Sequence, residues 1–176
     1  MRRTAMVLVS GLFSFSAHSA DIANIDIQCA KNSYHDYVDA SIEWYENLVR
    51  LTIKDDPKLK DVAEWFMDGR KKHFLLNKDA FDWYINNDES KLDFNTSVES
   101  WLKLSQEDIR KLSLTSTPIS GAAKEVFDFR QGKAHADNYA LRTAFADLLS
   151  HPKKIEEPLG TYNQKIEIIG KKSCLK

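Results

Sequence analysis

Three side chains at four-residue spacing, His35, Asp39 and Glu43, are the first candidates for chemistry in this sequence. Residues four apart stack on one face of an α-helix, where an imidazole and two carboxylates could share a divalent metal ion. Helices that expose Asp, Glu and His to water produce the same spacing by chance, so a solvated helix face is the competing interpretation. A metal site would also need a ligand from another helix. A small metal-dependent hydrolase built on these three residues is therefore one hypothesis for function.

A second pair, His135 and Asp137, has the types of a general base and its orienting carboxylate. No nucleophile is indicated beside them, so we expect His135 to be exposed to solvent and Asp137 to cap a helix. The sequence contains no phosphate-binding glycine loop, no His-Glu-x-x-His pattern and no Gly-x-Ser-x-Gly elbow. It therefore predicts no catalytic residue and no cofactor beyond the metal hypothesis.

Candidates for binding another protein are the tryptophans and one basic run. Tryptophan is enriched at the centres of interfaces, although we expect at least two of the four to lie in the core. The basic run could contact an anion or an acidic partner, or form a solvated helix face. The candidate binding residues are Trp44, Trp65, Trp83, Trp101, Arg70, Lys71 and Lys72.

Apolar residues recur at steps of three and four from Asn32 to Ile53, which predicts a long amphipathic helix. Asp56 and Pro57 then have the types of a cap and a first helical residue, so a second helix should begin there. Gly69 lies in its middle, where either the helix bends or another element approaches closely. We predict a separate short helix from Asp79 to Ile85.

Several shorter helices are predicted in the second half of the chain. Pro152 should stop a helix that spans residues 134–150, and after a charged connector Pro158 should start the last helix. No segment alternates like a strand. We predict an all-α domain of about six to eight helices, several of them short. The expected helix starts are Thr96 with Glu99, Ser105 with Asp108, and Thr117 before Pro118.

The first twenty residues have the three parts of a secretory signal peptide. Arg2 and Arg3 precede an apolar run from Ala5 through Phe15, and small residues follow up to Ala20. The run is too short for a membrane-spanning helix. We therefore expect residues 1–20 to be a signal peptide, cleaved after Ser19 or Ala20, and residues 21–176 to be one periplasmic or secreted domain without a membrane segment.

Cys29 and Cys174, the two cysteines, lie near opposite ends of that domain. Cysteines of an exported chain are commonly paired, and a bond between these two would close nearly the whole domain into a ring. Closing so long a loop could stabilise the fold by about 4 to 5 kcal/mol through the unfolded state.

The charge balance and the expected export restrict the class of partner. The chain has 25 basic and 26 acidic side chains, and removing Arg2 and Arg3 makes it more acidic. Nucleic acid is therefore not an expected partner, because binding it needs a basic field. We favour a protein-binding module without catalytic activity, most specifically an immunity or inhibitor protein that neutralises a toxin or enzyme delivered to the cell envelope. An accessory part of a secretion, pilus or conjugation apparatus is the other alternative.

Overall fold

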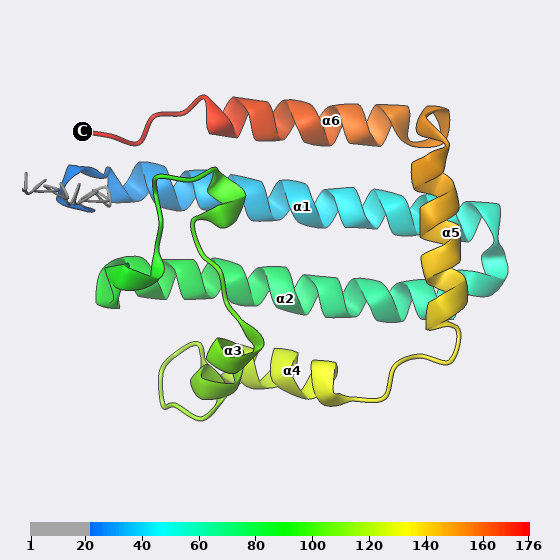
Figure 1. Ribbon diagram of the computed structural model, residues 1–176, viewed down its shortest axis with the longest axis horizontal. Helices are drawn as coiled ribbons and strands as arrows, with labels where there is room; N and C mark the ends of the chain where they lie inside the picture. The colour runs from blue at the N-terminus through cyan, green and yellow to red at the C-terminus, as the bar shows by residue number, and fades with distance from the viewer. Residues whose placement is uncertain (1–21) are drawn as a thin grey trace, which may run out of the picture.

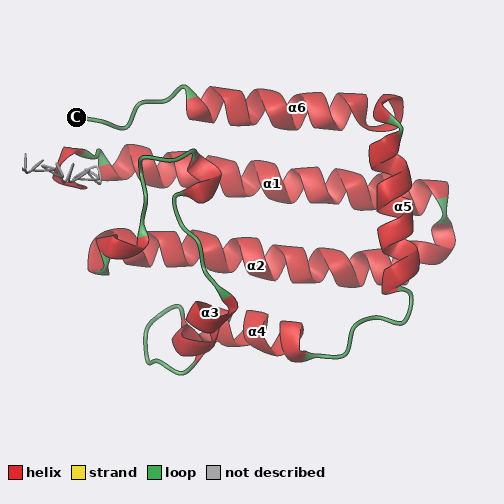
Figure 2. Ribbon diagram, in the orientation of Figure 1, coloured by secondary structure: helices red, strands yellow, loops and turns green. Residues whose placement is uncertain are grey.

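The computed structural model describes residues 22–176 and is all-α over that range, as predicted. Figure 2 shows helices joined by loops, and the described part has no β-strand, only two isolated bridges. The predicted signal peptide lies outside the described residues. The six α-helices are α1 (Ile27–Asp55), α2 (Lys60–Asn87), α3 (Gln106–Ser113), α4 (Ser120–Gln131), α5 (Asn138–Ser150) and α6 (Pro152–Gly170).

The two long helices α1 and α2 run antiparallel and form the centre of the molecule (Figure 1). Helix α6 packs along the other side of α1, and α4 packs along the other side of α2. Helix α5 crosses this layer near the end where α1 turns into α2, and it contacts both of them. The corner enclosed by α1, α2, α4 and α5 is the part of the fold that matters for the site described below.

Helix α2 is longer than the sequence predicts, because the expected helix from Asp79 to Ile85 is not separate. It forms the last turns of α2, which runs unbroken from Lys60 to Asn87. Asp79 is exposed within the helix and caps nothing, while Ala80, Phe81 and neighbouring residues extend the buried stripe. No proline or glycine lies between Gly69 and Asp79, so continuous burial of one face overrides the local capping signal.

The last helix also begins earlier than predicted. Helix α6 starts at Pro152, where the missing amide hydrogen costs no intrahelical bond. Pro158, expected to start the helix, lies inside it and cannot donate to the carbonyl of Lys154. Pro152 does end α5, as predicted, but residues 153–157 are helical and not a connector.

Of the predicted short-helix starts, the one at Ser105 is confirmed, whereas no α-helix begins at Thr96. Ser105 and Asp108 form a full capping box at α3, in which the Asp108 amide donates to Ser105 Oγ over 3.0 Å and the Ser105 amide donates to Asp108 Oδ2 over 3.0 Å. The segment after Thr96 forms only a single 3₁₀ turn, Val98–Ser100. This segment instead folds back on itself, since the Asp93 amide donates to the carbonyl of Trp101 over 2.9 Å.

The core between α1 and α2 is centred on Tyr34 and Phe81, whose rings stack at 4.1 Å between centroids. Two rings from the segment between α2 and α3 close this end of the core: Phe94 meets Phe81 edge-on, and Trp101 stacks on it, with 6.2 Å between centroids in both pairs. A second, smaller cluster lies where α5 crosses, with Leu141 buried against α2. This second cluster forms the floor of the corner between α2 and α5.

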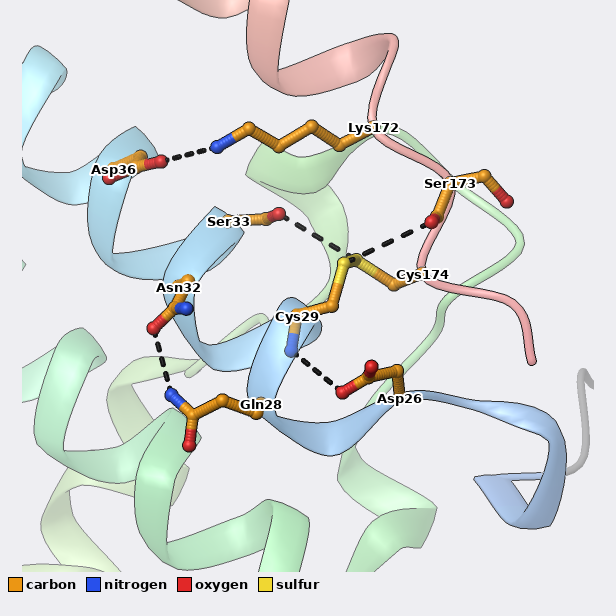
Figure 3. Close-up of a disulfide and its surroundings, with 9 residues drawn as sticks. All are labelled: Asp26, Gln28, Cys29, Asn32, Ser33, Asp36, Lys172, Ser173 and Cys174. Carbon is orange, nitrogen blue, oxygen red and sulfur yellow. Dashed lines mark hydrogen bonds and ion pairs between the residues drawn. A yellow bond between two sulfur atoms is a disulfide. The ribbon is translucent and has the colours of Figure 1, made fainter.

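The predicted disulfide is confirmed: Cys29 in the first turn of α1 is bonded to Cys174 near the end of the chain, with 5.5 Å between their Cα atoms (Figure 3). Backbone hydrogen bonds support the junction, because the Asp26 amide donates to the Cys174 carbonyl over 2.8 Å. Lys172 also forms an ion pair with Asp36 at 2.8 Å. The two ends of the domain are therefore fixed side by side. In the described part of the chain, no helix has the length and apolar character needed to cross a membrane.

Candidate functional site

A groove of about 670 Å³ lies in the corner enclosed by α1, α2, α4 and α5. Six of its fifteen lining residues are aromatic, and its polar groups are mainly three arginines and one histidine. We call it the aromatic–arginine groove. Its aromatic residues are Trp44, Tyr45, Trp65, Phe66, Phe129 and Phe145, and its basic residues are Arg70, His73, Arg130 and Arg142.

Helix α2 supplies the base of the groove through its periodicity. Trp65, Gly69 and His73 are spaced four apart, and Phe66 and Arg70 form a parallel row, so all five lie on one helix face. Trp44 and Tyr45 come from α1, and Phe129 and Arg130 from α4. Helix α5 closes the remaining side.

Gly69 is where α4 approaches α2, which confirms the second of the two predicted explanations for this glycine. The Phe129 ring lies over the glycine and stacks on Trp65 at 5.5 Å between centroids. A Cβ atom at position 69 would come within 2.6 Å of Phe129 Cζ. The aromatic wall on this side of the groove therefore depends on the absence of a side chain at position 69.

Arg70 and Arg130 are held by neutral groups. The Arg70 guanidinium lies over the rings of Tyr45 and Phe66, at 4.8 and 5.1 Å from their centroids. Arg130 Nη1 donates to Gln106 Oε1 over 2.9 Å, and Arg130 Nη2 lies 2.9 Å from His73 Nδ1. A guanidinium can only donate, so His73 Nδ1 must accept, and the imidazole is neutral with its proton on Nε2.

The electrostatics of the groove are those of crowded positive charge. Burial, Arg130 and Arg70 lower the pKa of His73 to about 4. Burial and the nearby Arg70 also lower the pKa of Arg130. Within residues 22–176, neither these two arginines nor Arg142 forms an ion pair with a carboxylate, and no acidic side chain lines the groove.

The predicted metal residues are not brought together. His35 Nε2 lies 3.0 Å from Asp82 Oδ1, whereas Asp39 pairs with Lys78 at 3.0 Å and Glu43 pairs with Lys165. Over residues 22–176, no group of three histidine, cysteine or carboxylate side chains is placed to hold a metal ion. Each member of the triple is thus held by a different partner on another helix.

The pair His135 and Asp137 differs from expectation. His135 is partly buried, and its Nε2 lies 3.0 Å from Asp61 Oδ2 on α2. Asp137 occupies the N-cap position of α5, but its side chain makes no capping hydrogen bond. Its amide instead donates to His135 Nδ1 over 3.2 Å. These contacts join the α4–α5 loop to α2.

The candidate binding residues divide into two sets. Trp44, Trp65 and Arg70 meet in the aromatic–arginine groove. Lys71 pairs with Glu46 at 2.7 Å and Lys72 pairs with Asp68. Trp83 and Trp101 pack against the main core, although all four tryptophans are partly exposed.

Sequence reasoning missed the groove itself and its residues from α4 and α5. Only Gly69 carried a signal, because a glycine inside a helix indicated that another element comes close. Comparison of the chain with protein-family models, with curated proteins and with solved structures finds no match. Guanidinium groups without carboxylate partners, flanked by aromatic walls, are chemically suited to an anionic group on an apolar stem.

Proposed function

We propose that this protein is a binding module of the cell envelope, and that it binds a protein partner through the aromatic–arginine groove. One observation carries the proposal: Trp44, Trp65 and Arg70 converge in a concave surface with Tyr45 and Arg130. Tryptophan, tyrosine and arginine dominate the binding energy of protein interfaces, above all where they cluster in a partly desolvated centre.

The packing beside the groove supports the same proposal. The stacked Trp65 and Phe129 rings fix the position of α4 on α2, and the disulfide joins the two ends of the domain near the start of α1, away from the groove. A surface that is ordered before binding loses less conformational entropy on association, which favours tight binding. Such a surface suits an immunity or inhibitor protein that neutralises a toxin or enzyme delivered to the cell envelope.

Site-specific photocrosslinking in the native cells tests the proposal. A photoreactive residue replaces Leu149, which lines the groove and is 51% exposed, or Leu114, which is 74% exposed and lies outside it. We expect one discrete protein adduct from position 149, lost when Trp65→Ala and Arg130→Gln are added, and none from position 114. No adduct at position 149, or the same adducts at both positions, would overturn the proposal.

The identity of the captured protein then tests the finer function. An immunity or inhibitor protein should abolish the activity of the purified partner at equimolar concentration. Cells that lack the gene should also lose viability when the partner reaches their envelope. A captured structural component of a secretion or pilus apparatus would instead support the accessory role.

A further inference from the structure

We propose that Arg70 and Arg130 form a carboxylate-binding site in the aromatic–arginine groove, and that its occupant is the C-terminal carboxylate of the partner, on an aromatic or branched apolar last residue. This inference rests on the proposed function for the source of the carboxylate. The site itself rests on the contacts of the groove.

Arg70 and Arg130 have hydrogen-bond donors that other described side chains do not use. A guanidinium has five N–H donors. Arg130 uses two of its donors for Gln106 and His73, and Arg70 makes ring contacts but no side-chain hydrogen bond within the described residues. Several N–H groups on the two side chains therefore have no acceptor in the part of the chain that the structure describes. A carboxylate, with two oxygens in one plane, matches such planar forks.

The positive charge at these donors is not neutralised by a described carboxylate. The basic run of α2 continues with Lys71 and Lys72, but each of these has an acidic partner. Among residues 22–176, Arg70 and Arg130 have no acidic partner, and they are close enough for Arg70 to lower the pKa of Arg130. An anion between them would remove this repulsion. Because His73 is neutral and carries its proton on Nε2, it can donate a hydrogen bond without adding charge.

The aromatic rings beside the arginines favour a C-terminal carboxylate over an acidic side chain. Both arginines line a groove with aromatic rings: Arg70 lies over the Phe66 ring, and Arg130 and Phe129 line the same groove. A C-terminal residue carries its apolar side chain on the carbon next to the carboxylate, so charge and apolar surface arrive together. An internal Asp or Glu brings only a short methylene stem. The groove volume of about 670 Å³ accommodates one such residue and its neighbour.

The test uses three small probes and the intact protein. N-acetyl-phenylalanine carries the terminal carboxylate, and its amide lacks the charge. N-acetyl-glutamate α-amide, which has no α-carboxylate but keeps its side-chain acid, represents an internal acidic residue. Binding is followed by the indole N–H signals of the four tryptophans in ¹⁵N NMR. We expect saturable shifts for Trp44 and Trp65, with Trp83 and Trp101 as internal references outside the groove.

We expect N-acetyl-phenylalanine to bind at least about tenfold more tightly than its amide or the glutamate probe, since a charge-assisted hydrogen bond contributes that much. Arg70→Gln and Arg130→Gln should each weaken it about tenfold or more, and Arg70→Lys should weaken it less. Arg50→Gln is the matched control, because Arg50 bonds Asn47 outside the groove and should not change binding. Circular dichroism and thermal unfolding verify that each variant is folded.

Three results would overturn the inference: equal affinity for the acid and its amide, no loss in the folded Arg70 variants, or tighter binding of the glutamate probe. These failures are distinguishable from failure of the proposed function. A partner crosslinked at position 149 without carboxylate selectivity would remove only the carboxylate site. Arginine-dependent probe binding without any captured partner would remove only the protein-binding function.

Discussion

Two charged regions of this molecule have opposite arrangements of their charges. On the face formed by α1, α6 and the segment after α6, Asp36 pairs with Lys172 and Glu43 with Lys165. In the aromatic–arginine groove, Arg70 and Arg130 have no carboxylate partner within the described residues. The first region uses its charges to join helices, whereas the second keeps positive charge available beside aromatic rings. The difference indicates that a candidate binding site is recognised by charged side chains that lack an ion-pair partner, and not by the number of charged side chains in a region.

The largest effect we expect comes from removing the covalent support of the α1–α6 face. Cys29→Ser with Cys174→Ser should lower the free energy of unfolding by about 4 kcal/mol, because the unfolded chain regains the freedom of a long open loop. Urea unfolding of the variant and of the oxidised wild type measures the loss. Unchanged stability would mean that noncovalent contacts, such as the packing of Trp44 on Tyr162, hold α6 on α1 without help from the disulfide.

A pH titration should reveal the crowded charge in the groove. The pKa of His73 is about 4 in the folded protein, below its ordinary value of 6.5, because of burial, Arg130 and Arg70. As pH falls below 6.5 the unfolded chain takes up a proton that the folded chain does not, so stability decreases until pH 4 and then levels off. We expect His73 to contribute a loss of about 2 kcal/mol between pH 7 and pH 5.

The His73→Gln variant isolates that contribution from the carboxylates that titrate in the same range. Its stability should fall less than that of the wild type between pH 7 and pH 5, measured by urea unfolding at both values. Parallel pH profiles for the two proteins would contradict the buried, neutral state of His73.

Gly69→Ala and Gly160→Ala compare the two regions through one added methyl group. At position 69 the methyl group meets the Phe129 ring, so we expect a loss of about 1 to 2 kcal/mol and weaker binding of N-acetyl-phenylalanine. At position 160, in α6, no described atom outside the adjacent residues and the local helix backbone lies within 4 Å of the new atom, and alanine should stabilise the helix by up to about 1 kcal/mol. Thermal unfolding measures both, and equal effects would contradict the close approach of α4.

The smallest effect should come from an ion pair on the α1–α6 face. Glu43 and Lys165 are both about half exposed, and exposed pairs contribute little. A double-mutant cycle with Glu43→Gln and Lys165→Met should give a coupling energy below about 1 kcal/mol. A much larger coupling would show that these charges, and not only the disulfide, hold the face together.

The sequence predicts features of this fold that depend on a few neighbouring residues or on general rules. The capping box of Ser105 and Asp108 is local, and the pairing of Cys29 with Cys174 follows from having only two cysteines in a chain expected to be exported. Local signals failed where packing overrides them: Asp79 does not start a helix, and Pro158 lies inside one. Burial of a continuous helix face decides both cases, and burial depends on the other helices.

The candidate site was predictable only in part, for the same reason. Trp65 and Arg70 could be nominated by residue type, and Gly69 indicated that another element comes close. Arg130 and His73 lie far apart in the sequence, and only the packing of α4 on α2 brings them within hydrogen-bonding distance. The equal spacing of His35, Asp39 and Glu43 is a stronger local pattern, yet their partners on other helices separate their roles.

The position of the disulfide has a mechanical consequence. A pull applied at Asp26 and Leu175, just outside the bond, reaches Cys29 and Cys174 before it reaches most of α1 or any part of α2 to α6. The load therefore passes through a covalent crosslink and bypasses the helices between the two cysteines. A protease that pulls on Leu175 would meet the same crosslink before it meets a helix.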